Sequence, residues 1–255
     1  MYPRSSVDLA LFLSCIGVLD RENALICDVS VGAIRHWRYG NRRTAESQPR
    51  RPESQCPRCH QRPLDEAAYA YLLGLYLGDG TLTLGRRGVY ALCLQCCDDW
   101  PGLIAAARDA LSAVMPTSRV SSRHRVGCTE VKSYSTHWPC LFPQHGPGRK
   151  HHRRIALEAW QQTITAEFTG AFLRGLFHSD GCRVINRVTG HLRAGDRRYE
   201  YPRYFFANES ADILGLCGTA LDQLGVSWRY SRRNTISVAR REAVARLDQF
   251  VGPKY

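Results

Sequence analysis

Residues 72–80 read LLGLYLGDG, and residues 173–181 read LRGLFHSDG. Both segments place a leucine two positions before a glycine, continue with a leucine and an aromatic residue, and end on a small residue, an aspartate and a glycine. The two aspartates, Asp79 and Asp180, stand 101 positions apart (180 − 79). A repeat of this length within one chain predicts two copies of the same structural unit.

Each segment predicts a helix that carries small residues on one face. Gly74 and Gly78 are four positions apart, and so are Gly175 and Ser179, which places each pair on one side of its helix. Glycine inside a helix costs about 1 kcal/mol relative to alanine. Its use on one face therefore indicates that the two helices pack closely against each other.

An aspartate stands at the C-terminal end of each predicted helix, where the helix dipole is negative. A carboxylate there is disfavoured by roughly 0.3–1 kcal/mol, and bringing Asp79 and Asp180 together adds their mutual repulsion. A divalent cation would relieve both costs, whereas the alternative makes the two aspartates ordinary capping or turn residues. We expect Gly80 and Gly181 to end the helices in the left-handed conformation.

The paired segments resemble the LAGLIDADG motifs of homing endonucleases, which occur twice in the single-chain members of that family. The resemblance covers residues 67–255. It implies an α+β fold of two αββαββα repeats related by a pseudo-twofold axis, with the motif helices at their interface and two four-stranded sheets forming a saddle over double-stranded DNA. It also implies a site-specific endonuclease of intron homing that acts as a monomer on an asymmetric target.

The resemblance assigns roles at the two motifs. Asp79 and Asp180 would hold Mg²⁺ or Mn²⁺ beside the scissile phosphates, because metal ions on paired carboxylates activate water and stabilise the phosphate charge. The residues expected to hold the metal are Asp79, Asp180, Gly78 and Ser179, the last two through backbone carbonyls. The family also uses a lysine or polar residue from each repeat, for which we expect Lys132 in the first repeat and Lys254 in the second.

Strand-like stretches follow each motif and carry arginine at alternating or turn positions. We expect strands at residues 183–188 and 199–207, joined by a loop over residues 189–198. Arginines on one sheet face can meet phosphates and base edges, although any single one is equally a solvated surface residue. The expected DNA contacts of the repeats are Arg86, Arg87, Arg123, Arg125, Arg183, Arg187, Arg197, Arg198, Arg232 and Arg233. The basic run 149–154, RKHHRR, is either a solvated linker or a phosphate contact.

The first 44 residues predict three short helices, the third of which spans residues 31–39 and is capped by Ser30. This layout resembles a helix-turn-helix domain, with a packing-only satellite as the alternative. The expected DNA contacts in it are Arg35, Trp37 and Arg38. The expected domains are a helix-turn-helix domain at 1–44, a linker at 45–66, and repeats at 67–162 and 163–255.

Cys56 and Cys59 form a CxxC pair within the expected linker. Such a pair supplies half of a tetrahedral Zn²⁺ site. Cys140 and His145 are far along the chain, so the sequence shows no second half nearby. The pair is therefore either a zinc ligand pair or an incidental one.

The composition favours a polyanionic partner. The formal net charge is +12, and only three of the 35 basic side chains are lysines. Arginine binds phosphate bidentately, although a GC-rich genome also enriches it. No apolar run approaches the ~20 residues that span a bilayer, and eleven cysteines without a disulfide rhythm indicate a reducing, bacterial cytoplasm with the protein on the nucleoid.

Two other functions share the implied fold. A transcription regulator can retain a LAGLIDADG core that no longer cleaves DNA, and an RNA-splicing maturase uses the same fold. The retained pair Asp79 and Asp180 favours the nuclease, because degenerate cores tend to lose these residues. The maturase has no support in the sequence beyond positive charge.

Overall fold

The computed structural model describes residues 2–40, 42, 56–192, 195–252 and 254. The chain forms two compact units, Met1–Gln55 and Cys56–Tyr255. Within the described residues, none of the helices has both the length and the apolar character needed to cross a membrane.

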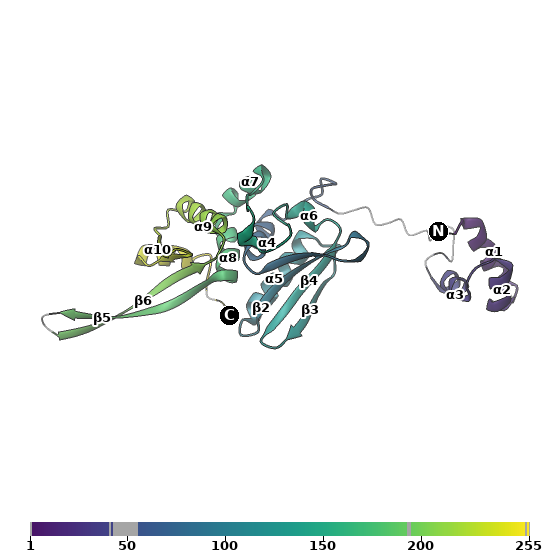
Figure 1. The fold of residues 1–255 in the computed structure, drawn as a ribbon, viewed down its shortest axis with the longest axis horizontal. Coiled ribbons are helices and arrows are strands. Elements are labelled where there is room, and N and C mark those ends of the chain that lie inside the picture. The colour runs from purple at the N-terminus through teal and green to yellow at the C-terminus, as the bar shows by residue number, and fades with distance from the viewer. Residues whose placement is uncertain (1, 41, 43–55, 193–194, 253, 255) are drawn as a thin grey trace. The chain divides into compact units, whose positions relative to one another are not determined.

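The described part of the first unit contains three helices (Figure 1), which are α1 (Arg4–Cys15), α2 (Asp20–Ile26) and α3 (Val31–Tyr39). Ser30 caps α3 as predicted, since its side chain accepts the Ala33 amide at 3.2 Å. Trp37 is only 3% exposed and packs edge-on against Tyr2. The expectation that Trp37 contacts DNA is therefore wrong, because its ring fills the small core of this unit.

The second unit runs through one order of elements twice, as the αββαββα expectation required. The first repeat consists of α4 (Glu66–Leu77), β1 (Gly80–Leu84), β2 (Tyr90–Cys97), α5 (Pro101–Val114), β3 (Val120–Arg125), β4 (Cys128–Ser135) and α6 (Trp138–Leu141). The second consists of α8 (Thr169–Asp180), β5 (Gly181–Leu192), β6 (Gly195–Ala207), α9 (Ala211–Gln223), β7 (Arg229–Arg232), β8 (Thr235–Val238) and α10 (Arg241–Asp248). Between them lie a 3₁₀ turn, η2 (Lys150–His152), and α7 (Ala159–Glu167); another, η1 (Arg86–Gly88), joins β1 to β2. The predicted α+β fold is confirmed.

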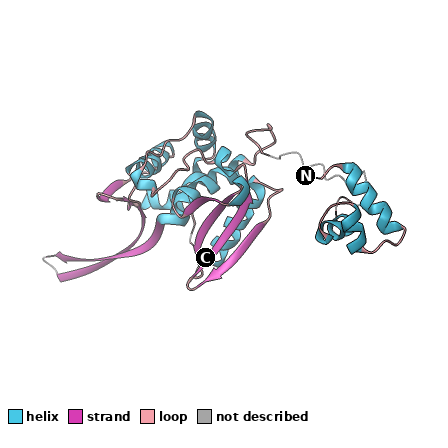
Figure 2. Ribbon diagram, turned by 45° about the vertical axis from the view of Figure 1, so that its right-hand side comes forward, coloured by secondary structure: helices cyan, strands magenta, loops and turns pink. Residues whose placement is uncertain are grey.

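Each repeat builds one four-stranded antiparallel sheet. The strand orders are β1-β2-β4-β3 and β5-β6-β8-β7, so the two sheets have the same topology. Helix α5 packs on the first sheet, while α9 and α10 pack on the second. One face of each sheet is thereby covered and apolar, and the other is open (Figure 2).

The β5–β6 hairpin is longer than expected. Its pairing runs without interruption from Gly181↔Phe206 to Leu192↔Gly195, so the expected loop over residues 189–198 is wrong. Antiparallel strands are joined by backbone hydrogen bonds that do not need apolar side chains. Polar residues therefore continue the ladder, and the hairpin projects away from the helices (Figure 1).

The motif helices α4 and α8 lie against each other at the centre of the unit. A Cβ placed on Gly175 would overlap the Tyr71 carbonyl oxygen and lie 3.0 Å from the Leu75 amide nitrogen. The helix backbones thus meet where the sequence places its small residues. His178 of α8 also joins the pair, because its Nδ1 accepts from the Tyr71 hydroxyl at 3.0 Å.

Gly80 and Gly181 are required for a different reason from the one expected. Gly181 has φ −101° and ψ 164°, and Gly80 opens strand β1, so neither forms the expected left-handed cap. A Cβ on Gly80 would lie 2.5 Å from Tyr76 Cα, and one on Gly181 would lie 2.7 Å from Phe177 Cα. Each glycine lets the outgoing strand pass directly over the last turn of its helix.

Candidate active site

The two aspartates reach one open groove from the ends of the paired helices. Asp180 is the last residue of α8, and Asp79 follows the end of α4 by two positions. A Cβ on Gly78 would lie 2.9 Å from Asp180 Oδ2, so the second carboxylate lies beside the end of the first helix. Both aspartates line a groove of about 940 Å³ that also borders β1 and residues 145–151.

The groove makes both carboxylates reluctant to ionise. Partial desolvation and then the charge of Asp180 raise the pKa of Asp79 to about 6, although its side chain still faces solvent at the groove mouth. Desolvation also raises the pKa of the half-buried Asp180, against the opposing effect of Asn208, which donates to its Oδ2 at 2.6 Å. The positive charges of Lys150 and Lys254 act in the opposite direction on both.

Two lysines lie beside these carboxylates, one for each motif. Lys150 Nζ donates to the Gly78 carbonyl at 2.7 Å and to the Tyr76 carbonyl, and Lys254 Nζ donates to the Ser179 carbonyl at 3.1 Å. Burial lowers the pKa of Lys150 to about 8 and also lowers that of Lys254. We call Asp79, Asp180, Lys150 and Lys254 the charged quartet.

The C-terminal segment that carries Lys254 is held by the second motif. His178 Nε2 lies 2.9 Å from the Val251 carbonyl, and a carbonyl only accepts, so Nε2 carries the proton while Nδ1 accepts from Tyr71. Burial lowers the pKa of His178 to about 4, so the ring is neutral near pH 7. This chain of hydrogen bonds ties Val251, three positions before Lys254, to helix α8.

The donor atoms of this site fit a hard divalent cation. Mg²⁺ and related ions take carboxylate and carbonyl oxygens, and the site offers two carboxylates, Asp79 and Asp180, with the carbonyls of Gly78 and Ser179 beside them. A cation would also remove the penalty that raises both carboxylate pKa values. The same two carbonyls accept hydrogen bonds from Lys150 and Lys254 in this structure, so they serve a metal only if the lysines move.

Lys132 lies on the open face of the first sheet. Its Nζ is 2.6 Å from Glu130 Oε2, and Arg125 and Gln95 also bond this carboxylate, at 3.0 and 3.1 Å. Hydrogen bonds from Lys132, Gln95 and Arg125 lower the pKa of Glu130 to about 2. Lys132 is thus compensated by an anion, and it is absent from the described residues that line the groove.

The arginines of the first repeat that were expected at DNA are exposed. Arg123 and Arg125 lie directly opposite Glu130 and Cys128, on the same open face as Lys132. Arg86 and Arg87 form the turn between β1 and β2, and Arg87 has a left-handed φ of 60°. All four side chains are exposed toward a ligand that lies along the open face, although Arg125 also pairs with Glu130 at 3.0 Å.

The arginines of the second repeat differ in their surroundings. Arg183 donates to Asp248 at 2.8 and 3.0 Å and lies opposite the buried Tyr204, so it joins β5 to α10. Its side chain stays partly exposed, and its contact with DNA stays a prediction. Arg187 pairs with Glu200 at 2.9 Å. The remaining positions are Arg198, Arg232 and Arg233, which are exposed, and Arg197, whose side chain lies outside the described residues.

In the first unit, both expected arginines contact one acidic residue. Arg35 and Arg38 extend from α3 and bond Asp20 at 3.1 and 2.7 Å. Arg35 keeps two thirds of its side chain exposed (67%), so it can also reach a ligand.

Sequence reasoning missed Lys150 and His137, and it set Cys140 aside because that residue lies far along the chain. Lys150 lies in the basic run 149–154, and the available signal was its rarity among 35 mostly arginine side chains. The structure also completes the CxxC pair, because His137 and Cys140 lie beside Cys56 and Cys59. His145, the histidine considered earlier, instead lines the groove.

No protein-family model and no curated protein matches this chain. Among solved structures, the homing endonuclease I-DmoI in complex with DNA and Ca is 17% identical, with 72% of this chain and 89% of that chain covered and a TM-score of 0.44. The LAGLIDADG meganuclease I-AabMI bound to uncleaved DNA is 10% identical, with 71% and 83% covered and a TM-score of 0.46. The N-terminal LAGLIDADG domain of DUF199/WhiA is 13% identical, with 79% and 88% covered and a TM-score of 0.42. The chain is thus similar in structure to LAGLIDADG proteins of two kinds, the meganucleases and the WhiA domain.

Proposed function

We propose that this chain binds double-stranded DNA along the open faces of its sheets and hydrolyses phosphodiester bonds with divalent cations held by Asp79 and Asp180. The observation that carries this proposal is the meeting of two carboxylates, from matched ends of paired helices, in one open groove. Each carboxylate is kept from easy ionisation by its surroundings. A divalent cation is the ligand that best relieves that state.

The chemistry divides between the cation and the chain. A bound Mg²⁺ or Mn²⁺ supplies an activated water and positive charge for the phosphate. Asp79 and Asp180 hold the ion, and Asn208 orients Asp180 through its 2.6 Å hydrogen bond. Lys150 and Lys254 add positive charge beside the two carboxylates and are better placed for this role than Lys132, whose charge is matched by Glu130.

DNA would be bound mainly through its phosphates. Arg86, Arg87 and Arg123 are exposed on the first sheet and its turn, and arginine pairs well with phosphate oxygens. The three-helix unit would add a second contact through Arg35, as a helix-turn-helix domain presents its last helix. Because both repeats lie in one chain, we propose that the protein acts as a monomer.

One observation favours a second candidate, a transcription regulator that binds DNA without cutting it. The charged quartet has two carboxylates and two ammonium groups, and each lysine already bonds a carbonyl that a metal would need. Such a site is electrically balanced without any cation. In that case the core of the second unit binds a specific DNA sequence and carries out no reaction.

In vitro selection on randomised duplex DNA separates the two functions. Wild-type protein and the double variant Asp79→Asn/Asp180→Asn are each used to enrich duplexes in Ca²⁺, and the bound duplexes are then moved to Mg²⁺ or Mn²⁺. If the protein is a nuclease, only the wild type should cut both strands of the enriched duplexes, while the double variant should still bind them. Asp109→Asn, an exposed site on α5, is the matched control and should cut normally.

If the wild type and the double variant enrich the same sequence and neither cuts it, the protein is a DNA-binding regulator without nuclease activity. Cutting that survives in the double variant would remove Asp79 and Asp180 from the proposal. If no sequence is enriched by either protein, DNA is not the ligand.

A further inference from the structure

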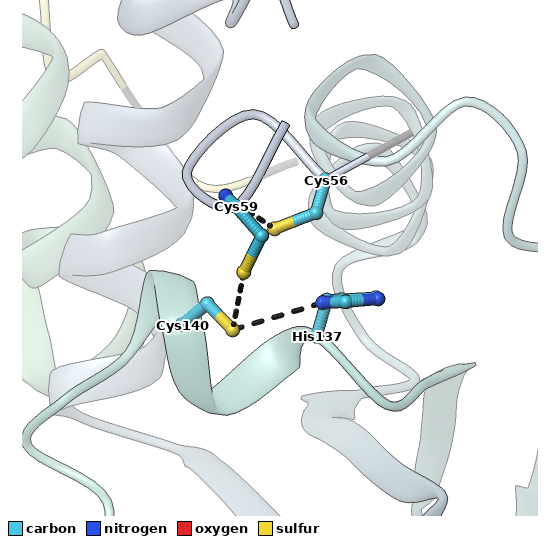
Figure 3. Close-up of side chains that lie close together, drawn as sticks. All are labelled: Cys56, Cys59, His137 and Cys140. Atoms are coloured by element: carbon cyan, nitrogen blue, oxygen red, sulfur yellow. Dashed lines mark hydrogen bonds between the residues drawn. The ribbon is translucent and has the colours of Figure 1, made fainter. Parts of the chain in front are cut away.

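A cluster of four metal-ligating side chains lies outside the charged quartet. Cys56 and Cys59 lie on the turn where the second unit begins, and His137 and Cys140 lie at the start of α6 (Figure 3). Their side chains converge, so that the three sulfur atoms and a histidine nitrogen all lie within 4.8 Å of one another.

The spacings are within a few tenths of an ångström of a tetrahedral ion site for the two contacts between neighbouring ligand atoms, and all four ligand atoms lie within 4.8 Å of one another. With Zn–S bonds of ~2.3 Å and Zn–N bonds of ~2.0 Å, neighbouring ligand atoms around zinc stand about 3.5–3.8 Å apart. Cys59 Sγ lies 3.3 Å from Cys140 Sγ, and Cys140 Sγ lies 3.8 Å from His137 Nδ1. The two sulfurs are not bonded, because a disulfide has a length of about 2.05 Å.

The backbone around Cys56 is arranged as in a metal-binding turn. The Cys59 amide donates to Cys56 Sγ at 3.4 Å, and the His60 amide donates to the Cys56 carbonyl at 3.0 Å. In this tight turn the Cys59 sulfur points toward Cys140 of α6, and the Cys56 sulfur lies beside the Cys59 backbone nitrogen (Figure 3). Each half of the cluster, CxxC and HxxC, has the two-residue gap typical of zinc ligands.

We propose that Cys56, Cys59, His137 and Cys140 bind one Zn²⁺ ion. Four protein ligands complete the tetrahedron and leave no position for water, which is the mark of a structural rather than a catalytic zinc. This inference is independent of the proposed nuclease, because the cluster shares no residue with the charged quartet.

The ion would fasten the beginning of the second unit to the first repeat. Helix α6 is already held in the core, with Trp138 and Leu141 fully buried. The Leu141 carbonyl also accepts the Tyr69 hydroxyl of α4 at 2.6 Å. Zinc would therefore join Cys56 and Cys59 to an element that is bonded directly to a motif helix.

The first measurement uses the wild-type full chain, purified under reducing conditions without added metal. Elemental analysis should find one zinc per chain. X-ray absorption at the zinc edge should show three sulfur ligands at ~2.3 Å and one nitrogen at ~2.0 Å. A chain without zinc that also fails to take up added Zn²⁺ or Co²⁺ overturns the proposal, as does a Cys59–Cys140 disulfide found by mass spectrometry of the reduced-purified chain.

Variants then locate the ion. Cys140→Ser should lose at least nine tenths of the bound zinc, whereas Cys27→Ser, a cysteine of similar exposure in the first unit, should retain it. His137→Cys replaces one ligand by another and should keep one zinc with four sulfur neighbours. This last result is informative even if Cys140→Ser fails to fold. Full zinc content in Cys140→Ser, or unchanged sulfur coordination in His137→Cys, would place the ion elsewhere and overturn the assignment.

Discussion

Gly74 and Gly175 lie back to back where α4 crosses α8. A Cβ built on Gly74 would lie 2.8 Å from Gly175 Cα and 2.5 Å from the Phe172 carbonyl oxygen. The atoms it meets belong to the helix backbone, which cannot move aside as a flexible side chain would. The meeting of the two helices, and with it the position of both aspartates, therefore depends on two hydrogen atoms in place of side chains.

Gly74→Ala is expected to destabilise the second unit by about 1–3 kcal/mol, the usual cost of overpacking, despite the better helix propensity of alanine. Gly215→Ala is the matched control, since Gly215 lies within α9 and a Cβ there meets nothing within 4 Å. This control should gain about 0.5–1 kcal/mol. Urea denaturation of both variants gives the two free energies of unfolding, and equal stability of the two would contradict the close crossing.

Asp79 should make the metal-free protein less stable as the pH rises. Its pKa is raised from 3.8 to about 6 in the folded chain, so the folded state binds this proton more tightly than the unfolded state. The resulting stabilisation is complete below about pH 4 and is lost as the pH rises through 6. The shift corresponds to about 3 kcal/mol without solvent screening, and to about 1 kcal/mol once the exposure of Asp79 is allowed for.

The test compares the free energy of unfolding of wild type and Asp79→Asn in EDTA at pH 4 and pH 7. The stability of the wild type relative to the variant should fall by about 1 kcal/mol between these values. Asp109→Asn should show no such change. Parallel pH curves for wild type and Asp79→Asn would show that the carboxylate ionises normally.

Lys150 is expected to compete with a divalent cation. Lys150→Met removes a positive charge beside both carboxylates and frees the Gly78 carbonyl, so Mg²⁺ should bind about tenfold or more tightly; a single neighbouring charge is worth up to ~4 kcal/mol. The melting temperature in increasing Mg²⁺ reports this affinity. Lys132→Met is the control and should bind Mg²⁺ as the wild type does.

Comparing Lys150→Met with the wild type also distinguishes the nuclease from the non-cleaving regulator. If Lys150 supports cleavage through its charge, Lys150→Met should bind Mg²⁺ yet cut DNA about 10²–10³-fold more slowly. If Lys150 keeps the metal out of a non-cleaving core, Lys150→Met should bind Mg²⁺ where the wild type does not. An unchanged Mg²⁺ response in this variant would count against any contact between Lys150 and the ion.

Arg123 and Arg183 should affect different properties. Arg123→Ala removes an exposed charge from the open face of the first sheet, so DNA affinity should fall and its logarithmic salt dependence should weaken by about one unit. Arg183→Ala breaks the bond to Asp248, so the unfolding free energy should fall by about 1 kcal/mol while the salt dependence stays the same. Binding isotherms at several salt concentrations and urea denaturation measure the two effects, and the reverse pattern would exchange their roles.

The fold was largely readable from the sequence because its signals are local and repeated. The two motif segments show small residues at the same positions and the same terminal aspartate, so the repetition predicted the paired helices, while the resemblance to the LAGLIDADG motifs implied the αββαββα order. The length of the β5–β6 hairpin was not readable, since residues such as Thr189 and Arg198 pair through their backbones and carry no apolar pattern. The glycines after the aspartates were recognised, but their reason is contact with Tyr76 and Phe177 rather than backbone angle.

The sequence predicted the two aspartates of the candidate site but not the lysine beside them, because the position of Lys150 depends on how a loop folds back onto the motif helix. Lys150 meets the Gly78 carbonyl across 72 positions, and Cys59 meets Cys140 across 81. No local pattern encodes such a meeting. The prediction that Trp37 contacts DNA was wrong for another reason. A tryptophan on a short helix is equally suited to a small core and to a surface, and only packing decides between the two.

Helix α4 has a consequence for how the protein is made. Every residue from Tyr69 to Leu77 is buried, and part of this surface is covered by α8, whose aspartate is synthesised 101 residues after Asp79. At 5–20 residues per second, the ribosome needs roughly 5–20 s to produce that cover. During this interval the nascent first repeat exposes the apolar face of α4 that α8 later covers, so this face is the part of the chain most open to wrong contacts before synthesis ends.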